Sequence, residues 1–431
     1  MPTGRDTSSS IVITGVGVVS PIGIGNDPFW QALVAGRSGV ELVSHDAETP
    51  RLAARVKDFD PAALLARRRK FLKVMPPAIQ YGTAAATLAM READLKRRDI
   101  PPDRLGVVFG AGRLSTTPQE LSAVLAACRN EAGKFIANRW GQAATDEIAP
   151  LWLLRQLPNM PASHVSIEFD ARGPNNTITS RDCGAILAVS EAVNLIEREV
   201  VDCVIVGGCG SLVAPLDWLK LRLFDELSES YADPEGACRP FDKSRDGTVV
   251  GEGAAAFVLE RRSHAIKRGA TVFAEVLGVG SGCDSMHSPA GNGLAHAVRA
   301  AVQSANLRPD QLGHINTHGH GGRKADRIEA SALATVFGDE LQRVPSTTLK
   351  GSFGSADAGS GAMELAASLL ALRHGMIPPS RNFRTPDPGC PLRLCADAEP
   401  ATNPTALVIS RTPMGQSAAM VIRSQEPASG N

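Results

Sequence analysis

The feature of this sequence that most constrains its fold is a repeated alternation of short apolar runs with longer amphipathic stretches. Runs rich in β-branched residues predict strands, and stretches with apolar residues at helical spacing predict helices. The predicted strands are apolar on both faces, so we expect helices to cover both sides of each sheet. These patterns together predict an α/β layered fold. The predicted strands of the N-terminal part span residues 10–19, 106–110, 203–208 and 254–259.

A second block of the same style begins near Arg262. In the first block, the stretch 184–198 predicts a helix whose apolar stripe includes Ile186, Val189 and Ile196. The repeated order of elements predicts two similar halves, 11–261 and 262–424, although no residue-level repeat supports it. The second block predicts strands at 271–278, 314–317, 405–410 and 418–422, with helices at 293–305 and 361–372. The polar ends, 1–10 and 425–431, are expected to be frayed tails.

Composition excludes several functional classes. The chain has 431 residues, 43% of them apolar, which is enough for two packed halves. Its 45 basic and 45 acidic residues cancel, so no general affinity for nucleic acid is expected. No apolar run approaches the roughly 20 residues that cross a bilayer, and the first ten residues lack the pattern of a signal peptide. We therefore expect a cytoplasmic protein without a membrane span. The eight cysteines form no CxxC pair, which predicts free thiols.

Glycine clusters follow two of the predicted strands and raise the question of nucleotide binding. Neither Gly15 and Gly17 nor the cluster at 106–112 completes a GxGxxG pattern before a helix with a suitably placed acidic residue. We therefore interpret these glycines as positions of tight turns and close backbone packing.

The segment 173–186 runs from a strand through a turn into the helix that starts near Gly184. A nucleophile there would lie at a helix N-terminus, where unpaired N–H groups and the helix dipole stabilise an anion and lower the pKa of a thiol. Cys183 is the obvious candidate. Its neighbour Asp182 has a simpler interpretation, since aspartate is a favoured helix N-cap.

The histidines His318 and His320 lie at the end of an apolar strand and are followed by Asp326 and Glu329. A single glycine separates the two histidines, so we do not expect both to face one site, and no third ligand suggests a metal. His318 is the better candidate for a polarising hydrogen-bond donor. His320 is interpreted as an exposed loop residue.

Lys350 lies in an apolar, turn-rich segment, so its ammonium group is expected to need a carboxylate partner, for which Glu329 is the candidate. Ser352 and Ser355 follow it and have a simple interpretation as caps of the helix at 361–372.

Four segments resemble the β-ketoacyl-acyl carrier protein synthases. They are IVITGVGVVSPIG (11–23), RPFDKSRDGTVVGEGA (239–254), NTHG (316–319) and TLKGSFG (348–354), and the resemblance covers about residues 10–424. It implies a thiolase fold, in which two similar βαβαβαββ halves form a five-layered α-β-α-β-α structure. It also implies a dimer, either a homodimer or a heterodimer with an active ketosynthase.

In that family a cysteine takes an acyl chain from the carrier protein, and two histidines polarise the malonyl thioester. Counting back from Gly207 and Gly208 places Asp182 at the nucleophile position and Cys183 just after it. His318 falls on the first histidine, whereas the second aligns with Ser355. Lys350 aligns with the family lysine and Glu329 with its carboxylate partner. A serine hydroxyl could supply part of what the missing histidine donates.

Two further segments correspond to functional regions of the family, namely its gating loop and its surface for the carrier protein. The gating loop near the C-terminus corresponds to 412–416, which includes Thr412 and Met414. The run Arg67, Arg68, Arg69 and Lys70 lies where related synthases dock the acidic carrier protein, although it also fits a solvated basic stretch.

The resemblance and its departures suggest a non-condensing or altered ketosynthase of fatty-acid or polyketide-type synthesis, similar to a chain-length factor. An aspartate is a much weaker nucleophile toward a thioester than a thiolate. No bound cofactor is expected, since the phosphopantetheine of acyl carrier protein would deliver the substrate. Two alternatives remain open. Cys183 could perform the usual condensation after a one-residue shift, or Asp182 and His318 could act as acid and base in hydrolysis, dehydration or cyclisation.

Overall fold

The computed structural model describes residues 9–44, 51–112, 118–224, 226–285 and 290–424. The predicted tails 1–10 and 425–431 lie almost wholly outside these ranges. Among the described residues, no helix combines the length and apolar character needed to cross a bilayer. All eight cysteines are described, and all are free thiols, as predicted.

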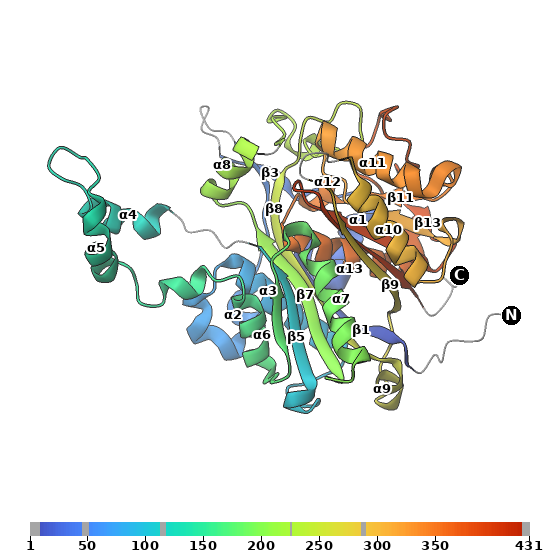
Figure 1. Cartoon of the computed structure of the whole chain (residues 1–431), viewed down its shortest axis with the longest axis horizontal. Helices are drawn as coiled ribbons and strands as arrows, with labels where there is room; N and C mark the ends of the chain where they lie inside the picture. Colours follow the sequence, from blue (N-terminus) through green and yellow to red (C-terminus); the bar gives the residue numbers. More distant parts are fainter. Residues whose placement is uncertain (1–8, 45–50, 113–117, 225, 286–289, 425–431) are drawn as a thin grey trace.

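Two halves repeat the same succession of elements, as the order of predicted elements suggested (Figure 1). The first half contains β1 (Ile11–Ser20), α3 (Pro77–Glu92), β5 (Leu105–Ala111), α6 (Met160–Phe169), β6 (Asn175–Ile178), α7 (Gly184–Glu197), β7 (Cys203–Ser211) and β8 (Val250–Arg261). The second contains β9 (Ala274–Cys283), α10 (Asn292–Ser304), β10 (His314–Asn316), α11 (Arg323–Phe337), β11 (Ser346–Thr347), α13 (Ala358–His374), β14 (Thr405–Arg411) and β15 (Gln416–Arg423). Each half therefore has the expected βαβαβαββ order.

Strand pairing repeats as well. The first half is ordered β6-β5-β7-β8-β1 and the second β11-β10-β14-β15-β9, and the two sets join where β1 pairs with β9. In each set the first two pairings are parallel and the last two are antiparallel. Matching order and direction in both sets supports a duplicated architecture more strongly than element order alone.

Helices separate and cover the two sets of strands. α3 packs on β1, β7 and β8, and α10 packs on β9 and β15 at the outside of the second half. α7 and α13 lie between the two sets, since α7 contacts β5, β7 and β15 while α13 contacts β7, β8 and β14. This arrangement is the expected five-layered thiolase fold. It buries α13 almost completely and brings its N-terminus beside that of α7.

The predicted strands and helices are confirmed, with shifts of a few residues at their ends. β9 begins three residues later than predicted and α13 three residues earlier. Gly15 and Gly17 serve close packing, because a Cβ at either position would collide with a carbonyl oxygen of α3. They lie inside β1, so the tight-turn part of the interpretation is wrong for them.

Smaller elements decorate this core. They are β2 (Gly23–Ile24), α1 (Asn26–Val34), β3 (Val40–Ser44), β4 (Arg51–Ala54), α2 (Pro61–Leu64), α8 (Pro215–Phe224), α9 (Arg262–Lys267), α12 (Lys350–Phe353), β12 (Met376–Ile377) and β13 (Glu399–Pro400). The helices α4 (Pro118–Ala127) and α5 (Trp140–Glu147) form an arm that projects from the body (Figure 1).

Candidate functional site

The N-termini of α7 and α13 meet at the carboxyl ends of β5 and β7. Glycines make this approach possible. A Cβ on Gly110 would collide with the backbone of Gly184, and a Cβ on Gly208 would collide with the carbonyl oxygen of Ala358. A Cβ at Gly184 would already lie 3.4 Å from the Cβ of Ala358. The site is therefore built where two helices that belong to different halves start side by side.

Asp182 lies on the short 3₁₀ turn Arg181–Cys183 that precedes α7. Its side chain is 3% exposed, and its Oδ1 has no hydrogen-bond partner. The N-cap of α7 is Cys183, with no side-chain cap. The capping interpretation of Asp182 is thus wrong, because Cys183 occupies the N-cap position of α7 and no side chain caps this helix. A buried acceptor without a donor is costly, which makes this carboxylate a functional candidate.

Cys183 follows Asp182 but points elsewhere. Its Sγ lies 3.3 Å from the carbonyl oxygen of Ser410 on β14 and 3.4 Å from that of Gln416 on β15. The residue is fully buried within the main hydrophobic cluster. Burial, and then the nearby Asp182, raise the pKa of this thiol well above its usual range. A buried thiol that donates to backbone carbonyls is a poor nucleophile.

Lys350 is the centre of a buried network from the second half. Its ammonium group lies 2.5 Å from Glu364 Oε1, 2.5 Å from the carbonyl oxygen of His318 and 3.2 Å from His318 Nδ1. Burial alone would lower the pKa of Lys350, but the carboxylates of Glu364 and Asp182 outweigh it and raise that pKa. The ammonium group therefore stays charged.

The expected pairing of Lys350 with Glu329 is wrong. Glu329 instead accepts the backbone N–H groups of His318 at 2.7 Å and Gly319 at 2.9 Å, so its carboxylate holds the turn after β10. Burial, reinforced by Asp326, raises the pKa of Glu329 to about 7. Glu364 comes from the interior of α13 and was missed. A single acidic residue inside an otherwise apolar helix was the available signal, since such a charge needs a partner.

The contact with Lys350 determines which proton His318 carries. An ammonium group can only donate, so Nδ1 of His318 accepts and the neutral ring holds its proton on Nε2. Burial and the Lys350 charge lower the pKa of His318 well below its usual value, which keeps the ring neutral. His318 is thus equipped as an N–H donor toward a carbonyl oxygen, as expected of a polarising residue.

His320 is buried rather than exposed, which corrects the sequence-based interpretation. Its ring stacks on that of His318 with 6.2 Å between centroids, and its Nδ1 accepts the N–H of Gly322 at 3.2 Å. The neighbouring glycines Gly319 and Gly321 have positive φ angles and allow the tight turn that buries His320. The two histidines therefore do lie side by side.

Ser355 and Asp357 lie between α12 and α13. Ser355 is buried and joins this segment to β8, since its N–H donates to Val249 at 2.7 Å. Neither Ser352 nor Ser355 caps α13, because the N-cap is Asp357. Asp357 itself was missed, since an aspartate before a helix usually signals no more than a cap.

The turn that corresponds to the gating loop connects β14 with β15. Thr412 is buried with no partner for its Oγ1, whereas Met414 is 62% exposed. Two contacts with Asp284 hold this turn. The guanidinium group of Arg411 lies 3.3 Å from the Asp284 carboxylate, and the N–H of Asp284 donates to the carbonyl oxygen of Gly415.

The basic run lies on the 3₁₀ helix Ala66–Val74. Arg67, Arg69 and Lys70 are exposed, as docking or solvation would require. Arg68 is not. It is 8% exposed, stacks over the ring of Phe71 and lies 3.9 Å from Glu168. Its guanidinium group is therefore a poor candidate for contact with a carrier protein.

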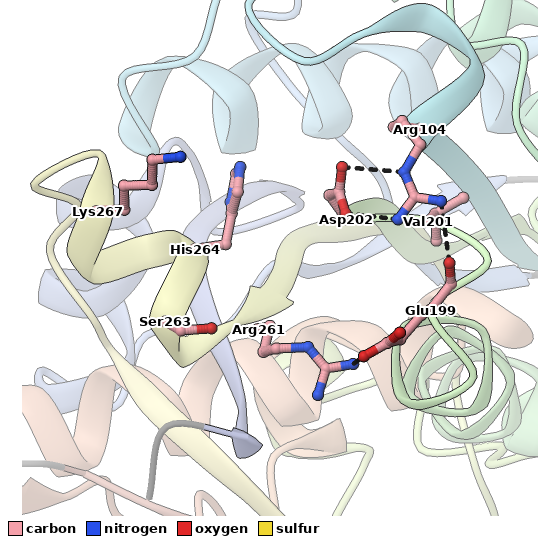
Figure 2. Close-up of a pocket in the computed structure, with 8 residues that line it drawn as sticks. All are labelled: Arg104, Glu199, Val201, Asp202, Arg261, Ser263, His264 and Lys267. Carbon is pink, nitrogen blue, oxygen red and sulfur yellow. Dashed lines mark hydrogen bonds and ion pairs between the residues drawn. The ribbon is translucent and has the colours of Figure 1, made fainter.

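A surface pocket of about 400 Å³ lies far from this site (Figure 2). It is lined by residues that include Arg104, Asp202 and Arg261, and it opens at the start of β7, whereas the site lies at the other end of that strand. At about 3.3 Å per residue the separation is roughly 25 Å. Arg104 is fully engaged with Asp202 at 2.6 Å and 3.0 Å, which favours a structural ion pair.

Comparison with known proteins gives matches along nearly the whole chain. The family "Beta-ketoacyl synthase, N-terminal domain" matches residues 8–265, and "Beta-ketoacyl synthase, C-terminal domain" matches residues 273–384. The boundary between the two matches lies between β8 and β9, where the two structural halves also meet.

Curated relatives and solved structures agree with these matches. The chain is 33% identical to 3-oxoacyl-[acyl-carrier-protein] synthase 2 of Coxiella burnetii, over 89% of this chain and 90% of the relative. It is 34% identical to the tetracenomycin polyketide synthase ketoacyl synthase alpha subunit of Streptomyces glaucescens, over 90% of each chain. The ishigamide ketosynthase/chain length factor superimposes with a TM-score of 0.83 at 27% identity, over 97% of this chain and all of that chain.

Proposed function

This chain belongs to the β-ketoacyl synthase family, and from that premise we propose that it is a non-condensing ketosynthase-like protein. It acts on acyl chains that an acyl carrier protein presents during fatty-acid or polyketide synthesis. The proposal is supported by two observations: Asp182, which the sequence resemblance assigns to the nucleophile position, lies buried on the turn before α7, and the thiol of the neighbouring Cys183 is turned into the core.

Condensation needs a nucleophile that forms a thioester. A carboxylate would form an anhydride, which water hydrolyses readily. Cys183 is held by two backbone carbonyls and its pKa is raised, so reaching the site would require breaking both contacts and rotating a buried side chain. Ser355 at the second histidine position removes a further donor. Each loss alone would slow condensation, and a lost oxyanion donor costs about 2.7–4 kcal/mol.

The polarising part of the site is retained. His318 keeps its Nε2 proton, Lys350 stays charged, and Glu364 balances that charge. A thioester carbonyl could therefore still be bound and polarised. Binding without bond formation suits a subunit that holds or shapes an acyl chain for a catalytic partner, as a chain-length factor does.

The apolar surface of the arm formed by α4 and α5 supports the proposal that this chain binds a partner protein. Among the described residues of the arm, the buried apolar cluster consists of Val124, Cys128 and Ala143, with Ala144 and Ile148 partly buried against it. Large apolar side chains are exposed along the arm at Leu125, Phe135, Trp140, Leu151 and Leu153. A core this small does not stabilise a projecting segment by itself. An exposed apolar surface of this kind marks an interface with another protein. We propose that a second ketosynthase chain covers it, as a homodimer or a heterodimer.

A condensation assay tests the proposal. The purified chain is incubated with acyl carrier protein and malonyl carrier protein, and mass spectrometry follows chain extension on the carrier. We expect no extension by this chain alone. Extension by the wild type that disappears in Cys183→Ala would overturn the proposal in favour of ordinary condensation.

The partner and the carrier are tested separately. Phe135→Ser combined with Trp140→Ser should convert the assembly to monomers in sedimentation analysis, whereas exposed Met414→Ser serves as the matched control. Charge reversal of Arg67, Arg69 and Lys70 should weaken carrier binding with a reduced salt dependence, whereas Arg68 changes should mainly lower stability.

A further inference from the structure

Asp357 is a buried acidic residue to which the proposed function gives no role. It precedes the N-terminus of α13, as Asp182 precedes that of α7. Asp357 has a φ of 54°, a backbone conformation that is uncommon for an aspartate. Its carboxylate occupies the space that a side chain at Gly112 would fill, at the carboxyl end of β5. Arg181, the residue before Asp182, lies 4.0 Å from its Oδ1. Because α7 and α13 start side by side, the charge of Asp182 reaches the carboxyl group of Asp357.

Several buried oxygens near the N-termini of α7 and α13 have no hydrogen-bond partner. They include Oδ1 of Asp182, Oδ1 of Asp357 and Oγ of Ser410, and their residues are 3%, 5% and 0% exposed. A Cβ on Gly361 would lie 2.7 Å from both the Ser410 hydroxyl and the Asp182 backbone oxygen, so Ser410 belongs to the same place. Buried polar groups normally find partners, so Asp182 Oδ1 and Ser410 Oγ are available to a ligand, whereas Asp357 Oδ1 has the Arg181 guanidinium group 4.0 Å away.

The charges around Asp357 come from two elements. Arg181 and Asp182 belong to the turn before α7, and Asp217 approaches from α8, where Lys220 lies 3.8 Å from it. Burial, followed by the negative charge of Asp182, raises the pKa of Asp357 to about 7. The negative charge of Asp182 therefore opposes ionisation of Asp357.

We propose that Asp182 and Asp357 form an acid–base pair that dehydrates a 3-hydroxyacyl thioester bound with its carbonyl oxygen on His318. The proposal rests on the proposed function, because it needs a carrier-bound thioester at this site and no competing thiolate. The inference adds a catalytic activity to a protein that the proposed function describes only as binding an acyl chain.

The reaction balances without an external reagent. His318 Nε2–H stabilises negative charge on the thioester oxygen, which makes the C2 hydrogen more acidic. The ionised carboxylate of the pair takes that proton, and the C2–H electron pair becomes the C2–C3 double bond. The C3–O bond breaks, and the protonated carboxyl gives its proton to the leaving hydroxide, which departs as water. After the reaction the pair still carries one proton, but on the other carboxyl group. Transfer of that proton between the two carboxyl groups restores the starting state.

The first test uses the full chain with 3-hydroxyacyl-pantetheine, a soluble thioester, and follows the enoyl thioester by its absorbance. We expect turnover by the wild type and a loss of 100-fold or more in both Asp182→Asn and Asp357→Asn, as removal of an acid or base typically causes. Asp217→Asn is the matched control, because it removes a neighbouring buried carboxyl that is not part of the pair. It should retain most activity.

A second measurement guards against variants that merely misfold. Infrared difference spectroscopy at neutral pH should show the carbonyl band of a buried protonated carboxyl in the wild type and in Asp217→Asn, with a lower titration midpoint in Asp182→Asn and loss of the Asp357 contribution to the band in Asp357→Asn. Absence of enoyl product from the wild type, or full activity in Asp357→Asn, would overturn the inference. Chain extension in the condensation assay would instead overturn the proposed function, so the two failures are distinguishable.

Discussion

The two halves contribute very different environments to one site. The second half supplies a charge-matched network, in which the Lys350 ammonium group lies between the Glu364 carboxylate and His318. The first half supplies Asp182, whose buried oxygen has no donor, and Cys183, which faces away. The difference supports the proposal that this site binds and polarises a carbonyl group without a nucleophile. The polarising residues and the nucleophile position lie on separate elements, so one can change without the other.

The largest expected effect comes from breaking the matched network. Lys350→Met should destabilise the protein by about 3–5 kcal/mol, because it leaves Glu364 buried without a counter-charge. Urea denaturation measures the loss. The double variant Lys350→Met, Glu364→Gln is the control, and it should recover much of the stability. If the single variant is as stable as the wild type, the network is not what distinguishes the second half.

Asp357 is a buried carboxyl of the second half that burial and the charge of Asp182 keep from ionising, and its substitution should act in the opposite direction. The pKa of Asp357 rises from 3.8 to about 7 on folding, so the folded state binds its proton more tightly than the unfolded state. Its contribution to stability therefore falls as pH rises from about 4 to 7 and stays low above that range. Three pKa units correspond to about 4 kcal/mol, so Asp357→Asn should be more stable than the wild type at pH 8 by up to that amount.

Measuring stability at pH 5 and pH 8 separates this effect from a general change in packing. The advantage of Asp357→Asn should be much smaller at pH 5, where the wild-type carboxyl is protonated. An advantage that does not depend on pH would contradict the assigned cause.

The smallest effect is expected at Cys183. Cys183→Ala removes a small side chain and two weak contacts to carbonyl oxygens, so a loss of about 1 kcal/mol is expected. Thermal denaturation measures it. The native thiol should also react slowly with iodoacetamide, with exposed Cys283 as an internal reference. Rapid labelling of Cys183 would show that the thiol reaches the surface.

The sequence predicted the fold well because strands apolar on both faces and helices with one stripe leave few layered arrangements. It also placed His318 and Lys350 at the site. The residue-level contacts were harder. Lys350 has two candidate carboxylates, and choosing Glu364 over Glu329 depends on which helix face reaches it, which requires the packed structure.

Residues in turns were the least predictable. The chain direction between Ser180 and Gly184 depends on the left-handed conformation of Arg181, with a φ of 46°, which no local pattern signals. In this turn the Cys183 thiol lies against the backbone carbonyls of Ser410 and Gln416. Burial of His320 and Arg68 likewise depends on segments distant in sequence that cover them.

Intact-mass spectrometry after incubation with acyl carrier proteins of several chain lengths tests the central claim most directly. The account predicts no covalent adduct on the wild type or on Cys183→Ala, and an acyl adduct on Asp182→Cys, which restores a thiol at the polarised position. A stable acyl adduct that maps to Cys183 in the wild type would contradict it.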